Sequence, residues 1–374
     1  MAKSFVRRAS KIFFISLNVL VIALFLLACL CPYISSASLW LIGFVGLIVP
    51  YLATLLILFT IFWLVAKPRI ALFSFVVLLV GIQQLYVLFA VHMTSTFNNK
   101  KEEAVLRIVD WNVQSFNGLT KNREAKKMVR NEIAESIAKL NPDVICLQEF
   151  NTATNGGEQA DNIALFTKNY PYYFFSKDYQ RSNGKYRSGC IIFSRYPIIR
   201  SERIAYPVAE SLIYADIVKG ADTVRVYTTH LQSFKFKKED YEGLDNITNT
   251  DDASVNASMN VFKKMRLAFG RRGKQTEMVK TETGKSPYPS IVCGDFNDVP
   301  NSNTYFKIKG DRQDAFLKHH FGIGRTYIWL APTLRIDYIL PDKNFEVKQF
   351  DLVDEDLSDH LMLVSDLKLK TKVQ

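Results

Sequence analysis

The 374-residue sequence predicts an α/β fold with two β-sheets packed face to face and helices outside, preceded by a membrane region. Three observations support this prediction. Apolar, β-rich segments outnumber helical segments from residue 104 onward, as expected for a fold built mainly of sheets. Short groups of polar residues end or interrupt these apolar segments. The first ninety or so residues are almost purely apolar, whereas the remainder is charged and mixed like a globular protein.

Three uncharged apolar segments, residues 12–28, 39–66 and 70–91, open the chain. Each approaches or exceeds the roughly 20 residues that a membrane-spanning helix needs. Pro50 interrupts the second segment, which a helix bundle tolerates because neighbouring helices satisfy the freed carbonyl. The alternative is a signal peptide cleaved near residues 36–38 and followed by buried core helices. Two further long uncharged segments favour three transmembrane helices within residues 1–93.

Basic residues predict the orientation of this region. They precede the first segment or separate the second from the third: Lys3, Arg7, Arg8, Lys11, Lys67 and Arg69. The loop at residues 32–38 is uncharged. The positive-inside rule therefore places the N-terminus in the cytoplasm. Three crossings then place the C-terminal domain in the periplasm or outside the cell, so we expect an integral protein of a bacterial inner membrane.

Residues 94–103 are polar and read as a tether, and residues 104–370 are long enough to form one large domain with its own core. Helical spacing of apolar residues predicts helices over residues 126–140 and 254–280. The expected strands are residues 105–109, 144–147, 172–175, 190–193, 212–218, 224–229, 291–293, 336–340 and 361–367. Cys146, Cys190 and Cys293 fall inside strands without metal-site spacing, and we interpret them as core residues.

Two polar residues follow neighbouring strands where a divalent cation could bind. Glu149 follows a buried strand, and a charge placed there needs a partner or a metal. Asn112 ends the preceding strand and offers an amide oxygen. Magnesium prefers oxygen ligands, usually one or two carboxylates with waters and substrate phosphate. Either residue alone fits an ordinary strand end equally well.

Asp295 and Asn297 are two residues apart, so both side chains point the same way if the strand continues through them. A carboxylate could then activate water while an amide binds phosphoryl oxygens. A turn at this turn-prone sequence is the alternative.

Asp337, Asp359 and two histidines complete the set of candidate residues. Asp337 lies between apolar residues, and a buried acid in that setting often orients an imidazole, for which His360 is the natural partner. Asp359 is adjacent to His360 and could serve as a metal ligand. His230 ends the strand at residues 224–229. The next segment, residues 234–250, reads either as a solvated loop, which we favour, or as an aromatic and basic lip that touches a phosphate polymer or a lipid headgroup.

These short polar motifs, in this order, resemble those of the endonuclease/exonuclease/phosphatase superfamily. That superfamily includes DNase I-like nucleases, apurinic-site endonucleases, bacterial sphingomyelinases and inositol polyphosphate 5-phosphatases. The resemblance covers nearly the whole segment of residues 104–370, and Gly294–Asn297 and Ser358–His360 are its most diagnostic strings. The other matching strings are Trp111–Asn112, Leu147–Glu149, Ser194–Pro197, Thr229–Leu231 and Arg335–Tyr338.

The resemblance implies a DNase I-like, four-layered α/β sandwich and hydrolysis of phosphoesters with Mg²⁺, or with Mn²⁺ in its place. It implies Glu149 as the main metal ligand, with Asn112 and Asp359 supporting the site. Asp295 would orient or deprotonate the attacking water, and Asn297 would bind the phosphate. His360, paired with Asp337, and His230 would stabilise the developing negative charge or assist the leaving group.

One departure concerns a tyrosine that some nuclease members use. Tyr186 lies one residue from the expected position, which Arg187 occupies, so no catalytic tyrosine is transferred. This departure weakens the hypothesis of a DNA-repair nuclease more than the hypothesis of a phosphoesterase in general.

The sequence therefore favours a membrane-anchored metal-dependent phosphoesterase. Its expected partners are the lipid bilayer and a phosphoester substrate, either nucleic acid or a phospholipid-type molecule, and no protein partner is inferred. A catalytically inactive binding or scaffold protein with the same fold is the alternative. A three-span sensor or transport module is a third hypothesis, although no charge within the spans indicates an ion pathway.

Overall fold

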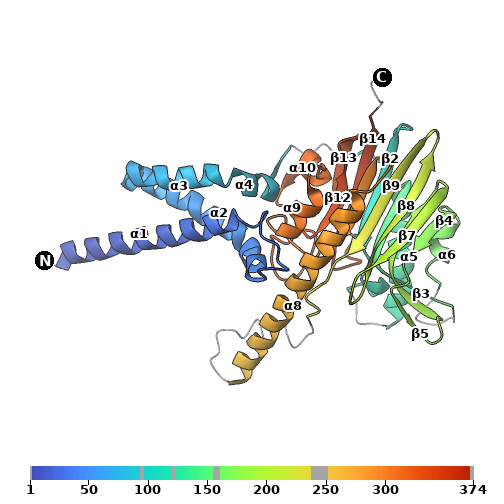
Figure 1. Cartoon of the computed structure of the whole chain (residues 1–374), viewed down its shortest axis with the longest axis horizontal. Coiled ribbons are helices and arrows are strands. Elements are labelled where there is room, and N and C mark those ends of the chain that lie inside the picture. Colours follow the sequence, from blue (N-terminus) through green and yellow to red (C-terminus); the bar gives the residue numbers. More distant parts are fainter. Residues whose placement is uncertain (1, 93–96, 120–122, 155–160, 237–251, 371–374) are drawn as a thin grey trace.

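The computed structural model describes residues 2–92, 97–119, 123–154, 161–236 and 252–370. Its N-terminal region consists of four helices. These are α1 (Ala2–Ala28), α2 (Leu41–Ala66), α3 (Pro68–Val80) and α4 (Ile82–Leu88). They project from the sheet domain, with the N-terminus at the far end (Figure 1). Within the described residues, α1 and α2 are each long and apolar enough to cross a membrane.

The third expected span, residues 70–91, is not one continuous helix. It is broken between α3 and α4, whose axes differ by 64°. Contacts with the C-terminal domain explain the break: Asn301 Nδ2 donates to the backbone and side-chain oxygens of Gln84 at 2.8 Å, and Arg335 Nη2 donates to Val87 O at 2.8 Å. The described residues therefore contain two candidate spans, and the predicted third span remains only if the bent pair α3 and α4 crosses as one.

Two large sheets form the C-terminal domain. In order across the seven-stranded sheet lie β13 (Phe345–Val353), β14 (Met362–Leu369), β2 (Val105–Asn112), β3 (Val144–Ala153), β6 (Tyr186–Ser194) and β4 (Tyr172–Phe175), with β5 (Tyr179–Arg181) also paired to β6. Across the five-stranded sheet lie β12 (Asp337–Pro341), β10 (Ser290–Asp295), β9 (Asp222–His230), β8 (Ser211–Lys219) and β7 (Ile198–Ala205). The short strands β1 (Ala90–Val91) and β11 (Phe321–Gly322) pair separately.

Alternation of side chains along these strands builds the layers. Cys146 of β3 and Val226 of β9 belong to the core between the sheets, whereas their neighbours Ile145 and Tyr227 belong to cores on the two outer faces. Helices cover both outer faces: α5 (Arg123–Lys139) and α6 (Ala164–Thr167) lie on the seven-stranded sheet, and α8 (Asp252–Thr283) and α9 (Asn303–Lys309) on the five-stranded one. The short helix α10 (Ala315–His319) adds Phe316 to the inner core, and a 3₁₀ turn spans Gln114–Phe116. The expected four-layered α/β sandwich is confirmed (Figure 1).

The direction of the strands brings the polar groups of residues at their ends to one edge of the sandwich. The pairs β2–β3 and β9–β10 are each parallel, so their carboxyl ends meet there. Asp295 of β10 lies opposite Asp337 of the antiparallel strand β12. Gly294 has φ +136°, and any Cβ at this position would collide with the backbone of Thr229, so the close approach of β9 and β10 requires glycine.

Candidate active site

The edge formed by these strand ends surrounds a cavity of about 800 Å³. Six of the eight predicted site residues line it: Glu149, His230, Asp295, Asn297, Asp359 and His360. Asn112 and Asp337 lie behind this lining and are hydrogen-bonded to it. Residues far apart in sequence, from Glu149 to His360, thus share one cavity because the two sheets bring their strand ends to the same edge.

Asp337, His360 and Asp295 form a buried chain of ionisable groups. His360 Nδ1 lies 3.1 and 2.9 Å from the two carboxylate oxygens of Asp337, and His360 Nε2 lies 3.7 Å from Asp295 Oδ2. Burial lowers the pKa of His360, but the charges of Asp337 and Asp295 outweigh this effect and raise it to about 10. The imidazole is therefore protonated and positively charged at neutral pH.

His230 lies on the other side of Asp295. Its Nε2 is 3.5 Å from Asp295 Oδ2 and 3.9 Å from Glu149 Oε1, and its Nδ1 is 3.8 Å from Glu210 Oε1. Burial lowers the pKa of His230, but Glu210, Asp295 and Glu149 raise it more, so the net shift is upward. Sequence reasoning missed Glu210, which precedes β8 and has a buried Oε2 without a hydrogen-bond partner among the described residues.

Asp295 lies between the two imidazoles. Burial and the Asp337 charge raise its pKa, the imidazoles lower it, and it comes to about 6, so the carboxylate is ionised at neutral pH. Asn112 Nδ2 donates to Asp295 Oδ2 at 3.1 Å. Of the two alternatives for this segment, the turn is the one that the structure has. β10 ends at Asp295, and Asn297 has φ +51° and donates its backbone N–H to Asp295 Oδ1 at 2.7 Å, as in an Asx turn.

Glu149 is placed in the cavity by an irregularity in β3. The pairing of β3 with β6 shifts register between Leu147 and Phe150, and Glu149 has φ +50°. Such a bulge redirects a side chain at a strand end. The Glu149 side chain is 39% exposed, and Asn112 Nδ2 donates to its Oε1 at 3.4 Å. The carboxylate therefore reaches the cavity while remaining tied to β2.

Asp359 and Gln114 form the opposite wall. Gln114 Nε2 donates to Asp359 Oδ2 at 3.0 Å. Burial raises the pKa of Asp359, His360 lowers it and the Glu149 charge raises it, with a net upward shift. Gln114 Oε1 is buried and has no hydrogen-bond partner among the described residues. Sequence reasoning missed Gln114, which lies in the irregular turn after β2 where no periodicity marks it.

These oxygens fit a hard divalent cation. The carboxylates of Glu149 and Asp359 are close enough for one charge to raise the pKa of the other group, and Gln114 Oε1 lacks a partner. A bound cation would relieve both effects. Asp295, Asp337 and His360 also lie within 4.8 Å of one another, but His360 Nδ1 is already engaged by Asp337, which favours a hydrogen-bonded relay over a metal cage.

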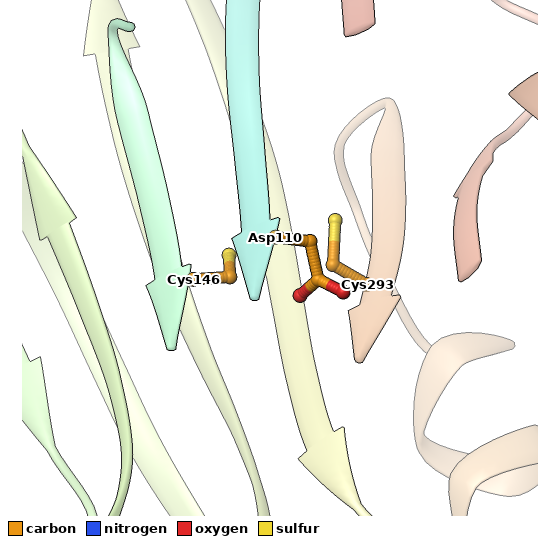
Figure 2. Close-up of side chains that lie close together, drawn as sticks. All are labelled: Asp110, Cys146 and Cys293. Atoms are coloured by element: carbon orange, nitrogen blue, oxygen red, sulfur yellow. The ribbon is translucent and has the colours of Figure 1, made fainter. Parts of the chain in front are cut away.

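A second cluster lies between the sheets beneath the site. Figure 2 shows Asp110 of β2 with Cys146 of β3 and Cys293 of β10, whose ligand-type atoms lie within 4.8 Å of one another. Burial is the main cause that raises the pKa of all three groups, so both thiols keep their protons at neutral pH. Thiolates, which a metal would require, are disfavoured there. The two cysteines are core residues, as expected from the sequence.

Apolar and aromatic side chains form the mouth of the cavity. Leu47 of α2 lines it, as do Phe234 and Phe236 after β9. Trp329 and Leu330 also line it and are 51% and 53% exposed. Of the segment predicted as loop or lip, residues 234–236 thus face the cavity, and residues 237–250 lie outside the described residues.

Several solved structures are similar to this chain. The solved structure of an endonuclease/exonuclease/phosphatase from Beutenbergia cavernae is 20% identical and covers 71% of this chain and 72% of its own, with a TM-score of 0.50. The human Nocturnin catalytic domain with bound sulfate is 19% identical over 72% of this chain and 95% of its own, with a TM-score of 0.48. D. rerio TDP2 complexed with a single-strand DNA product is 18% identical over 71% of this chain and 99% of its own, with a TM-score of 0.48. No curated protein matches the chain significantly.

Two sequence families match different parts of the chain. Residues 10–88 match a family described as "Domain of unknown function (DUF8431)". Residues 111–360 match the family described as "Endonuclease/Exonuclease/phosphatase family". This second match spans more than half of the chain and includes all eight predicted site residues. The chain therefore belongs to the endonuclease/exonuclease/phosphatase family.

Proposed function

We propose that the protein is a membrane-anchored phosphoesterase that requires a divalent cation and hydrolyses the phosphoester of an amphiphilic, lipid-type substrate. One observation carries the proposal: the cavity that holds the Asp295, His230 and His360 side chains is also lined by Leu47 of a candidate membrane helix. The catalytic groups and the membrane region therefore meet at one site.

Glu149, Asp359 and Gln114 would hold Mg²⁺, or Mn²⁺ in its place, with the Asn112 side chain supporting Glu149. When bound, such a cation neutralises phosphate charge and polarises the phosphoryl group. All three residues offer oxygen atoms, which matches the preference of these ions.

Asp295 is the group best suited to take a proton from the attacking water. It is ionised at neutral pH, is fixed by Asn112 and the Asn297 backbone, and lines the cavity. The Asn297 amide donates to Leu231 O at 2.9 Å, and its second hydrogen, which has no other acceptor among the described residues, could donate to a phosphoryl oxygen. His230 and the protonated His360 flank Asp295 and would stabilise negative charge on the phosphoryl group and the leaving oxygen.

The catalytic domain would lie on the membrane face opposite the N-terminus. Gln84 Nε2 of α4 donates to Ala28 O at the end of α1, so the domain-bound helix α4 meets α1 at its carboxyl end. The basic residues of the membrane region lie at the start of α1 and at the junction of α2 and α3. By the positive-inside rule that basic end is cytoplasmic.

A lipid-type substrate fits the cavity better than a nucleic acid. Its mouth is apolar, with Leu47, Trp329 and Leu330, and Lys235 is the one lysine or arginine among its described lining residues. The basic cluster of α8, which could attract a polyanion, lines a different groove. Nucleic-acid sites usually place several cations along the substrate path.

The test is a turnover assay on the full chain reconstituted in vesicles. Phospholipids in the vesicle, plasmid DNA and a water-soluble chromogenic phosphodiester would be compared, each with Mg²⁺, with chelator, and with Mg²⁺ restored. We expect metal-dependent hydrolysis of lipid, and loss of at least about 100-fold in the Asp295→Asn variant.

Equal rates for wild type and Asp295→Asn on every substrate would favour the inactive scaffold and overturn the proposal. Hydrolysis of DNA with no turnover of any lipid would overturn the substrate class while leaving the metal-dependent phosphoesterase intact.

A further inference from the structure

A second groove, of about 520 Å³, lies between helix α8 and the loop that joins α1 to α2. Ser36 and Trp40 of the loop line one side. Four basic residues of α8 line the other: Lys263, Arg266, Arg271 and Lys274. None of these residues lines the catalytic cavity, so the groove is a separate feature of the molecule.

The α8 wall of this groove has an unbalanced positive charge. Residues 263–274 contain six basic residues and no acidic one. Arg272 is buried and paired with Asp298 at 3.2 Å, on the side of the helix that faces the sheet. Lys263, Arg266 and Lys274 point the other way, as their helical spacing requires, whereas Arg271 Nη1 donates to Gln232 Oε1 at 3.2 Å. Within the described residues none of the four groove cations forms a salt bridge with a carboxylate.

The loop wall is built to hold the groove in shape. Gly273 of α8 allows the loop to approach closely, because a Cβ at that position would collide with the backbone nitrogen of Ala37. Arg266 lies over the Trp40 ring at 5.2 Å, and Trp40 packs edge-on against Phe262. A Cβ on Gly270, in the middle of the cations, would meet no atom within 4 Å, so the centre of the groove is open.

Ser36 adds a polar group without a partner. Its side chain is buried, and its hydroxyl makes no hydrogen bond among the described residues. Buried polar atoms are normally satisfied, so an unsatisfied hydroxyl among a groove's lining residues indicates a missing ligand or water. Guanidinium and ammonium groups beside a hydroxyl are the donors that bind phosphate oxygens.

The location of the groove identifies the source of the phosphate. The loop at residues 29–40 connects the two candidate membrane spans, so it lies at the membrane surface when both cross. Trp40 suits that level, where aromatic residues gather at the interface. Phospholipid headgroups lie at the same level.

We propose that this groove binds the phosphate of an anionic phospholipid headgroup at a site distinct from the catalytic cavity. The proposal rests on the membrane anchoring proposed above but not on hydrolysis. Bound lipid would fix the position of α8, and with it the catalytic domain, relative to the bilayer surface.

The test uses the full chain with Asp295→Asn, in neutral detergent, so that hydrolysis cannot remove the probe. Binding of fluorescent phosphatidylglycerol is titrated and compared with fluorescent phosphatidylcholine. The groove variant Lys263→Gln/Arg266→Gln/Lys274→Gln removes three exposed cations, and the control Lys139→Gln/Lys168→Gln/Lys343→Gln removes three exposed lysines elsewhere. We expect the groove variant to bind phosphatidylglycerol about 100-fold more weakly and the control to bind like wild type.

Inorganic phosphate and a short single-stranded DNA serve as competitors. The lipid assignment is overturned if inorganic phosphate or DNA displaces phosphatidylglycerol at concentrations equal to that of the lipid, or if both triple variants bind alike. Hydrolysis is measured separately on the groove variant with Asp295 intact. Lipid binding without any hydrolysis would refute the proposed enzymatic activity and leave the assignment of the groove intact. Hydrolysis without groove-dependent lipid binding would refute the assignment of the groove and leave the enzymatic activity intact.

Discussion

The Asp337 side chain does not line the cavity, but its charge determines the protonation state of His360, which does. Its carboxylate contacts His360 Nδ1 through both oxygens, and Thr326 Oγ accepts its backbone N–H. The pair keeps the imidazole protonated on Nδ1 and leaves Nε2 directed at Asp295. An amide in place of this carboxylate would preserve the shape and remove the charge.

We therefore expect Asp337→Asn to lower kcat by about 10²- to 10⁴-fold with little change in KM, because the stabilised charge develops only in the transition state. Asp222→Asn removes an exposed carboxylate of the β8–β9 hairpin and serves as the matched control. Steady-state kinetics of the metal-loaded enzyme measure the effect. A change in KM alone would contradict the role given to Asp337.

Asp110 gives a prediction about stability rather than activity. Its pKa is raised well above the usual value, first by burial and then by the Asp337 charge, and Oδ2 has no hydrogen-bond partner among the described residues. The folded chain therefore holds a proton that the unfolded chain releases above its ordinary pKa of about 4. The free energy of unfolding therefore falls as pH rises from about 4 toward the pKa of Asp110 in the folded chain, by about 1.4 kcal/mol for each pH unit.

Asp110→Asn keeps the shape of the protonated acid and cannot ionise, so this part of the pH dependence should disappear. The melting temperature of the detergent-solubilised full chain, measured at pH 5 and pH 8 with chelator, should fall less in the variant than in wild type. Asp222→Asn should behave like wild type. Parallel curves for Asp110→Asn and wild type would show that Asp110 is ionised in the folded protein.

The eight predicted site residues stand out in the sequence because each lies within or next to an apolar strand segment. Glu149 and Asp295, for example, are charges placed directly after buried runs. Gln114 and Glu210 could not be found this way. Both have positive φ in turns between elements, where polar residues are expected for local reasons alone. Only the folded arrangement brings them to Asp359 and His230.

At the scale of elements, the interior strands and the edge strands β4 and β12 were predictable, whereas the edge strands β7 and β13 were not. Polar residues interrupt the apolar ones along both β7 and β13, so neither has the continuous apolar run of a buried strand. The third apolar segment contains a bend that was not predictable either. Its composition is uniformly apolar, but hydrogen bonds from Asn301 and Arg335 turn its last part toward the domain. Local composition cannot reveal such distant partners.

The loop that carries Trp329 and Leu330 provides a prediction at this scale. Both residues are more than half exposed at the cavity mouth, and Leu330 has φ +70°, an unfavourable conformation for leucine. We expect Trp329→Ala/Leu330→Ala to reduce turnover of bilayer lipid about tenfold or more through lost apolar contact. Turnover of a water-soluble phosphodiester should be unchanged, since among the described residues no hydrogen bond joins either residue to the catalytic groups. Equal losses on both substrates would indicate damage to the site instead of lost membrane contact.

For the whole molecule, the number of membrane crossings decides where the catalytic domain faces. Two crossings return the chain to the side of its N-terminus, and three place the domain on the opposite side. α3 has 13 residues and is about 20 Å long, shorter than a typical hydrocarbon core of about 30 Å. It nevertheless leads from the basic α2–α3 junction to the helix that binds Ala28 O at the other end of α1. This path supports three crossings with the bent pair acting as the third.

Accessibility of single cysteines tests that topology. In a Cys29→Ala background, where the remaining native cysteines are buried, Lys67→Cys marks the α2–α3 junction and Asp222→Cys marks the far end of the catalytic domain. Three crossings place these positions on opposite faces. In sealed right-side-out vesicles, a membrane-impermeant maleimide should modify residue 222 and spare residue 67, and detergent should expose both. Modification of both positions, or of neither, before detergent would mean that the chain crosses twice and that the catalytic domain shares the side of the N-terminus.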